Sequence, residues 1–303
     1  MTFTNQVIKN IVKRVIKGQD YRIEVVNLIN TDFLQFVIDF FKKIIKVKLE
    51  NKDVVNWYKK EFLKNTLPPD EIALHAGLNM KTIHNMYGSS AKEIVIDAAY
   101  EHYDSLYEAI SGFIDNNEDL TLMLTLKFNG VCVDLTINET LLVINTLAVK
   151  RAALRGGAWS AVGKTAEKIL MKTICELYKI PTNNYEEKFV RDSAKKVSRE
   201  VDFYLKDNEG KKYLCEVKLM GRGNPESADV IFARKSHIFI ADTLSQQNKN
   251  QSDELGVVWV ELRVANSYRR IKKAFDKYGI PYVDYDGGNL DKDLDMILNK
   301  IME

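Results

Sequence analysis

The sequence predicts a mostly helical N-terminal region followed by a domain of α/β type, in which helices and strands alternate. The chain as a whole is therefore predicted to be α+β. Two observations carry this prediction. Apolar residues recur at helical spacing through residues 2–64 and 91–116, whereas strand-length runs bounded by turn residues dominate the later part of the chain. Those runs alternate with helical segments, which is typical of a sheet covered by helices.

Composition limits the class of protein only loosely. The chain has 303 residues, 46% of them apolar, and a formal net charge of +2, so any nucleic-acid binding must come from local basic patches. The three cysteines and four histidines are dispersed without the spacing of a zinc site. Lysines interrupt the apolar residues of the first 20 positions, so we expect neither a signal peptide nor a membrane segment, but a cytoplasmic protein.

Residues 1–120 are expected to form a helical DNA-recognition region, with a helix-turn-helix at about residues 69–88. There Ala73 is small enough for a second helix to cross closely, and Gly77 can take the left-handed turn conformation. Leu78, Ile83 and Met86 are expected to bury the pair. Polar residues of the second helix are then expected to face outward and contact phosphates and base edges. They are Asn79, Lys81, Thr82, His84 and Asn85. Any small helical hairpin with a glycine turn has the same pattern, so a purely structural role is the alternative.

Residues 121–154 are expected to form a hairpin and a connecting helix. Alternation around Asn129-Gly130 is the strongest hairpin signal in the chain, and this hairpin could be a wing beside the helix-turn-helix or an addition to the later sheet. The following helix is apolar nearly all round and is expected to end at a flexible corner, Arg155-Gly156-Gly157. Arg155 could contact a phosphate backbone or simply suit a helix C-terminus.

A second hairpin is predicted from residues 199–205 and 213–219, which flank a turn containing Gly210. If Leu205 lies opposite Tyr213, antiparallel pairing places Asp202 directly across from Glu216. Lys218 lies two residues beyond Glu216 and therefore shares its face of the strand.

Charged side chains in this otherwise apolar hairpin need a physical reason. Carboxylates on opposed positions lie roughly 5 Å apart at Cβ and repel each other, and a divalent cation would remove the repulsion. Two carboxylates, waters and a substrate phosphate suit Mg²⁺, while Lys218 could orient or deprotonate a water or neutralise charge on a pentavalent phosphate. The alternative is a structural ion pair of Lys218 with Glu216 or Asp202.

Other segments of the C-terminal half supply further candidates. Residues 160–178 predict an amphipathic helix with Glu167 in its middle, and this glutamate could also be an ordinary surface residue near Lys164 and Lys168. Arg222 lies in a glycine-containing loop and can contact a phosphate. Runs 237–241 and 257–262 predict a strand-helix-strand crossover, and 280–283 predict one more strand.

Together these elements carry a resemblance. Asp202, thirteen intervening residues and Glu216-Val217-Lys218 resemble the PD-(D/E)XK nuclease signature, with Val201 in place of its proline. The element order resembles a restriction-endonuclease-like core over about residues 155–285, within a nuclease domain of residues 155–303. The strings RGGAWSAVGK, REVDFYL, EVKLMGRGNPESAD and WVELR are similar to the CfrBI family of type II restriction endonucleases.

The resemblance implies a prokaryotic homodimer that binds a short palindromic site in double-stranded DNA and hydrolyses one phosphodiester per strand with Mg²⁺. It implies metal ligation by Asp202 and Glu216, catalysis by these two with Lys218, and a further acid from Glu167. A cognate DNA methyltransferase would belong to the same restriction-modification system. Two alternatives stay open: a structure-specific or repair nuclease with the same core, and a non-catalytic helix-turn-helix regulator.

Overall fold

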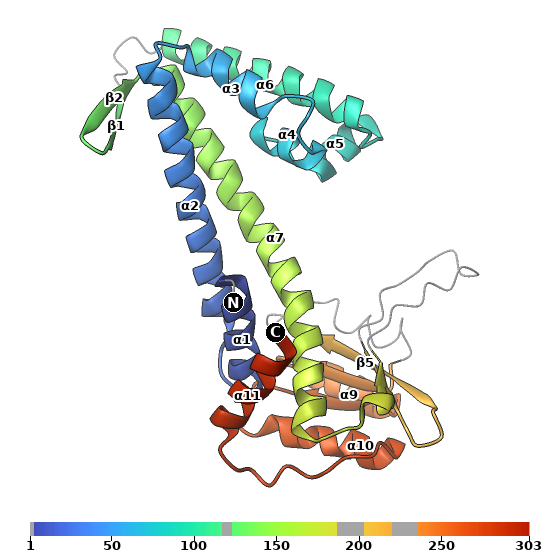
Figure 1. The fold of residues 1–303 in the computed structure, drawn as a ribbon. Helices are drawn as coiled ribbons and strands as arrows, with labels where there is room; N and C mark the ends of the chain where they lie inside the picture. Colours follow the sequence, from blue (N-terminus) through green and yellow to red (C-terminus); the bar gives the residue numbers. More distant parts are fainter. Residues whose placement is uncertain (1–2, 117–122, 187–202, 220–235, 303) are drawn as a thin grey trace. The chain divides into compact units, whose positions relative to one another are not determined.

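Two compact units make up the chain in the computed structural model, which describes residues 3–116, 123–186, 203–219 and 236–302. One unit comprises Met1–Leu28 and Ala158–Glu303, and the other comprises Ile29–Gly157. Figure 1 draws the fold and labels its α-helices and some of its strands. The mixture of helices with two sheets confirms the α+β expectation, and the functional boundaries expected at 120/121 and 154/155 stay predictions.

The elements have the following bounds. The helices are α1 (Phe3–Ile16), α2 (Arg22–Leu49), α3 (Val54–Phe62), α4 (Pro69–His75), α5 (Met80–Tyr87), α6 (Lys92–Asp115), α7 (Ile137–Leu177), α9 (Gln246–Glu254), α10 (Lys272–Tyr278) and α11 (Leu290–Met302), with the 3-10 helices η1 (Thr182–Asn184) and η2 (Ser267–Ile271). The strands are β1 (Leu124–Phe128), β2 (Val131–Leu135), β3 (Tyr185–Glu186), β4 (Phe203–Lys206), β5 (Lys212–Lys218), β6 (Ile238–Ala241) and β7 (Val258–Glu261).

The larger sheet has the strand order β3-β4-β5-β6-β7. The pairs β3/β4 and β4/β5 are antiparallel, whereas β5/β6 and β6/β7 are parallel. All four residues of β6 are buried, which explains its uninterrupted apolar sequence, because an inner parallel strand is covered on both faces. Helix α9 connects β6 to β7, so the expected strand-helix-strand crossover is confirmed.

The expected strand at residues 280–283 is wrong. In the described part of the chain after β7 no further strand occurs, and this segment instead runs beside the end of α7, where the Val283 amide donates to the Tyr178 carbonyl at 2.8 Å. Pro281 has no amide hydrogen for a sheet ladder, which weakens any pairing of so short a segment.

The expected corner at Arg155-Gly156-Gly157 is also wrong. Helix α7 continues through it as one helix of 41 residues. A glycine inside a helix costs only about 1 kcal/mol relative to alanine. The helix-forming residues before and after the two glycines can offset this cost, so the turn stays helical. The boundary between the two units falls at these glycines, between Gly157 and Ala158.

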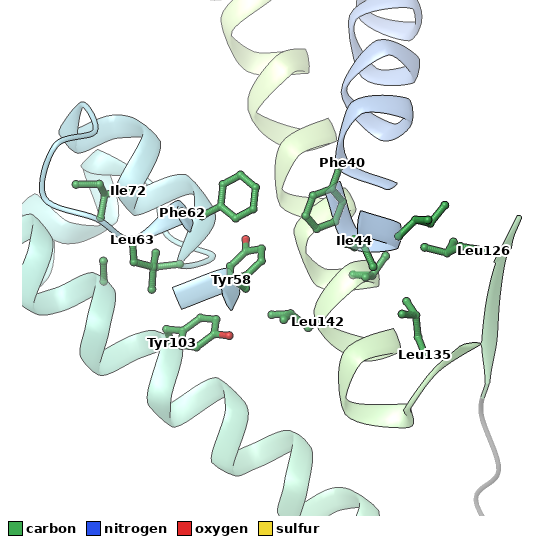
Figure 2. Packing of buried hydrophobic residues seen from close by; sticks show 14 of the residues in the cluster. Phe40, Ile44, Tyr58, Phe62, Leu63, Ile72, Tyr103, Leu126, Leu135 and Leu142 are labelled. Atoms are coloured by element: carbon green, nitrogen blue, oxygen red, sulfur yellow. The ribbon is translucent and has the colours of Figure 1, made fainter. Parts of the chain in front are cut away.

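Ile29–Gly157 has an aromatic-rich core, drawn in Figure 2. Tyr58 is 1% exposed, stacks on Tyr103 with 5.7 Å between ring centroids, and donates its hydroxyl to the His75 carbonyl at 3.0 Å. The β1–β2 hairpin adds Leu126 and Leu135 to this core. That hairpin forms a two-stranded sheet of its own, so it is not an addition to the larger sheet.

His75 makes the stability of this unit depend on pH. Burial, together with the charges of Lys150 and Lys43, lowers the pKa of His75 to about 4. The unfolded chain, with an ordinary histidine pKa near 6.5, binds more protons between these values, so the free energy of unfolding rises with pH across that window. We expect the contribution of neutral His75 to be complete above about pH 6.5 and to be lost as the pH falls toward 4.

Urea unfolding at pH 5 and pH 7, followed by circular dichroism, measures this effect. The pH 7 sample should be the more stable, and the difference between the two pH values should shrink in His75→Phe. An identical difference in the variant would contradict the assignment to His75.

Candidate functional site

The β4–β5 hairpin has the register that the sequence predicts. Leu205 pairs with Tyr213 and Phe203 with Cys215, and Gly210 in the turn has φ +83°. Asp202 precedes β4 and lies outside the described residues, so its position opposite Glu216 stays a prediction.

Glu216 and Lys218 lie side by side on β5, a strand that is hydrogen-bonded on both edges. The Lys218 Nζ is 3.0 Å from Glu216 Oε1, and their side chains are 19% and 0% exposed. Burying a carboxylate is costly unless a charge or hydrogen-bond donors compensate it, and the ammonium supplies that compensation. The structure therefore forms one of the two alternative ion pairs, and this pair is compatible with a site that also acts on a substrate.

Glu167 is brought to the same strand by α7. Its side chain is buried, and Oε1 accepts a hydrogen bond from the Leu219 amide at 2.8 Å, directly after Lys218. The alternative of an ordinary surface glutamate is therefore wrong. Three of the four residues expected in the catalytic site, Glu167, Glu216 and Lys218, thus meet at the carboxyl end of β5.

The expectations missed a buried ion pair next to this strand. Asp242 follows β6, is 1% exposed, and donates its amide to the Lys218 carbonyl at 3.1 Å. Arg263 follows β7 and holds the Asp242 carboxylate with two hydrogen bonds, Nε to Oδ1 at 2.8 Å and Nη2 to Oδ2 at 2.7 Å. This bidentate bond to Asp242 raises the pKa of the Arg263 guanidinium.

The corner between α1 and α2 joins the same ion pair. Arg263 Nη1 is 3.1 Å from Asp20 Oδ2, and Arg22 Nη2 is 3.6 Å from Asp242 Oδ2. Between them Tyr21 is 3% exposed, and burial, followed by the charge of Asp242, raises the pKa of its phenol. One sequence signal pointed to Asp242 and Arg263, since each is a charged residue directly after a buried apolar run.

A second glutamate–lysine pair lies two strands away. Parallel pairing places Glu261 in register with Ala241 and, through it, with Lys218. Glu261 Oε2 accepts from Lys249 Nζ at 2.6 Å. Burial would raise the pKa of Glu261, but the bond from Lys249 and the Leu244 amide outweigh it, so the pKa is lowered.

The expected DNA-contacting residues are partly exposed on α5. Lys81, His84 and Asn85 are exposed, whereas Thr82 is half-buried and its amide donates to the Asn79 side chain at 2.9 Å, so Asn79 caps the helix. Arg155 is exposed on α7, and Arg222 lies outside the described residues.

The packing expected of this helical hairpin is confirmed except at one residue. Ala73 and Ile83 are fully buried, Leu78 is half-buried against them, and Gly77 has φ +85°. Met86 lies in the last turn of α5, is 63% exposed, and does not belong to the cluster that buries Ile83. The expectation that Met86 buries the pair is therefore wrong.

The donor set at the end of β5 suits a hard divalent cation. Glu167 and Glu216 provide carboxylate oxygens, the ligands that Mg²⁺ prefers. Within residues 3–116, 123–186, 203–219 and 236–302 no group of three or more histidines, cysteines, aspartates or glutamates could hold a metal. The third expected carboxylate, Asp202, lies outside those ranges. No helix of the described residues is both long and apolar enough to cross a membrane.

Comparison with known proteins gives one match. A family model described as CfrBI restriction endonuclease matches residues 5–249, which is most of the chain. No curated protein and no solved structure matches the chain.

Proposed function

The chain belongs to the CfrBI restriction endonuclease family, and from that premise we propose that it is a Mg²⁺-dependent type II restriction endonuclease with a PD-(D/E)XK catalytic core. The substrate is a short, palindromic site in double-stranded DNA, in which it hydrolyses phosphodiester bonds. The observation that carries the proposal is the Glu216–Lys218 pair at 3.0 Å on a buried strand, with Glu167 bonded to the next residue.

Glu216, Glu167 and Asp202 would hold the metal ion, since each can offer an anionic oxygen. Bound Mg²⁺ supplies Lewis-acid stabilisation of the charge that develops on the phosphoryl group. Lys218 has a separate task. Its side chain is 19% exposed, and from the position beside Glu216 the ammonium neutralises charge on the phosphate and orients the attacking water.

Digestion of plasmid DNA with Mg²⁺ tests the proposal. Discrete fragments with constant ends support a restriction endonuclease, and sequencing of those ends gives the site. A smear of products instead supports a structure-specific or repair nuclease with the same core, and no cleavage supports a DNA-binding regulator.

Glu167→Gln is expected to raise the Mg²⁺ concentration required for half-maximal cleavage by roughly tenfold or more, because one anionic oxygen beside the metal site is lost. The measurement is a titration of cleavage rate with Mg²⁺. Glu176→Gln is the matched control, since Glu176 lies on the same helix and bonds Lys300 at the surface. Equal Mg²⁺ dependence in Glu167→Gln and the unchanged enzyme would remove Glu167 from the metal site.

We also assign α4 and α5 to a DNA-binding helix-turn-helix, with Lys81 on phosphates and Asn85 on a base edge. Lys81→Ala should weaken binding to all duplexes alike and lower the slope of log K against log salt by about 1. Asn85→Ala should cost about 1–3 kcal/mol on the cognate site alone. Filter binding with Ca²⁺ measures both, and Lys60→Ala on α3 is the control. No change in either variant would leave α4 and α5 with a structural role only.

The proposal includes two partners. Two-fold symmetry of a palindromic site matches a homodimer, in which each protomer cuts one strand. A cognate methyltransferase in the same cytoplasm would protect the prokaryotic host DNA. Sedimentation with and without a cognate duplex tests the dimer.

A further inference from the structure

A basic groove lies along the outer edge of β7. Its volume is about 620 Å³. It is lined by Asp253, Gly256, Val257, Val258, Trp259, Arg270, Lys273 and Lys277. Strand β7 is the last strand of the larger sheet, so among the described residues no strand pairs with this edge. We call this feature the edge groove.

Cations dominate the edge groove. Arg270, Lys273 and Lys277 are exposed, and their spacing of three and four residues places them on one side of the η2–α10 segment. In the part of the chain that the structure describes, Arg270 and Lys273 form no ion pair. The single acid, Asp253, accepts a hydrogen bond from Trp259 Nε1 at 2.8 Å. Three cations therefore face one acid in the lining, and the charge of Arg270 is partly balanced by Glu261, whose pKa it helps to lower. The groove keeps a net positive charge that solvent can reach.

Strand register relates the edge groove to the candidate active site. Trp259 is in register with Phe239, and Phe239 is in register with Glu216. With about 4.8 Å between neighbouring strands, the groove begins roughly 10 Å from Glu216, within the same unit. Duplex DNA carries one phosphate per roughly 3.4 Å along each strand, so a duplex bound at Glu216 has further phosphates within this distance.

We propose that the edge groove binds the phosphodiester backbone of the substrate duplex beyond the scissile phosphate, through Arg270, Lys273 and Lys277. The inference rests on the proposed function, which supplies the DNA. These contacts are independent of base sequence and fix the duplex across the β5 site. A second copy of the chain is disfavoured as occupant, because two copies of the same edge would bring like charges together.

The test measures DNA binding directly, with Ca²⁺ in place of Mg²⁺ and with salt varied. Arg270→Gln/Lys273→Gln should lower the slope of log K against log salt by about 2, since each lost phosphate contact removes about 1. Affinity should fall roughly tenfold, equally for cognate and unrelated duplexes. The matched control is Lys292→Gln/Lys300→Gln, which removes two charges from α11 in the same unit and should leave the slope unchanged.

Four results would contradict the inference. If the wild-type protein binds DNA and Arg270→Gln/Lys273→Gln has the same salt slope, the inference is overturned and the proposed function stays intact. If the groove variant sediments differently from the wild-type protein in the absence of DNA but has the same salt slope, the edge groove contacts a second copy of the chain instead. Failure of the unchanged protein to bind any duplex would overturn the proposed function and the inference together. If the glutamine variant does not fold, Arg270→Lys/Lys273→Arg must keep the slope of the unchanged protein, and a reduced slope would contradict the proposal.

Discussion

Glu216→Gln is expected to slow DNA cleavage by about 10³-fold or more while leaving DNA binding in Ca²⁺ largely unchanged. The amide has the size of the carboxylate, so the buried strand keeps its packing, but it lacks the negative charge that holds a divalent cation. Lys218→Met, which keeps most of the side chain and removes its charge, is expected to have a similar effect. Single-turnover cleavage and filter binding measure the two quantities separately.

Glu261→Gln is the matched control for this experiment. Glu261 is in register with Lys218 on the same sheet and forms an ion pair with Lys249. Removing the charge of Glu261 therefore tests the effect of breaking a glutamate–lysine pair outside the candidate site. We expect its cleavage rate to stay within a few-fold of the unchanged enzyme. If Glu216→Gln keeps its activity, or if both variants lose activity only as far as they unfold, the Glu216–Lys218 pair is structural.

Arg263→Ala is expected to lower the free energy of unfolding by about 3 kcal/mol. The substitution leaves Asp242, which is 1% exposed, without its two short hydrogen bonds, while Arg22 stays 3.6 Å away. Substitutions that leave a buried carboxylate without a compensating charge are among those that lower the free energy of unfolding most. Urea unfolding followed by fluorescence measures the loss.

Two further variants separate burial from charge loss. Lys300→Ala breaks an exposed pair with Glu176 and should cost less than about 1 kcal/mol. Adding Asp242→Asn to Arg263→Ala removes the unpaired charge and should recover part of the lost stability. A cost below 1 kcal/mol for Arg263→Ala would mean that water or Arg22 compensates Asp242.

Local patterns were sufficient to predict the hairpin of the candidate site. Apolar and polar residues alternate on both sides of Gly210, and this alternation determines how β4 pairs with β5. A shift of the pairing by one residue would turn every apolar side chain to the wrong face of the sheet. The apolar run that became β6 was equally clear, since a parallel strand covered on both faces is apolar throughout. The run that became β7 was clear from its valines and tryptophan, although it forms the edge of the sheet. Glu167 was assigned to the site only through the family resemblance, and the helix pattern alone left open whether it is a surface residue.

Features set by distant contacts could not be predicted. Nothing near Asp242 in the sequence indicates that Arg263, or the corner at Asp20, will meet it. The two glycines after Arg155 favour a break, yet α7 continues, because a glycine inside a helix costs only about 1 kcal/mol relative to alanine. The apolar residues at 280–283 suggested a strand, although a proline and a missing neighbour leave them without a ladder.

The place of β5 between β4 and β6 also affects how the enzyme meets its substrate. Amides of an inner strand that is paired on both edges exchange with solvent mainly in openings that approach unfolding of the whole unit. Glu216 and Lys218 are therefore held in place by the folding of the sheet, and the entropy of ordering them is already lost before DNA arrives. Binding energy from the duplex can then be directed to positioning the scissile phosphate against a site that needs no rearrangement of its own strand.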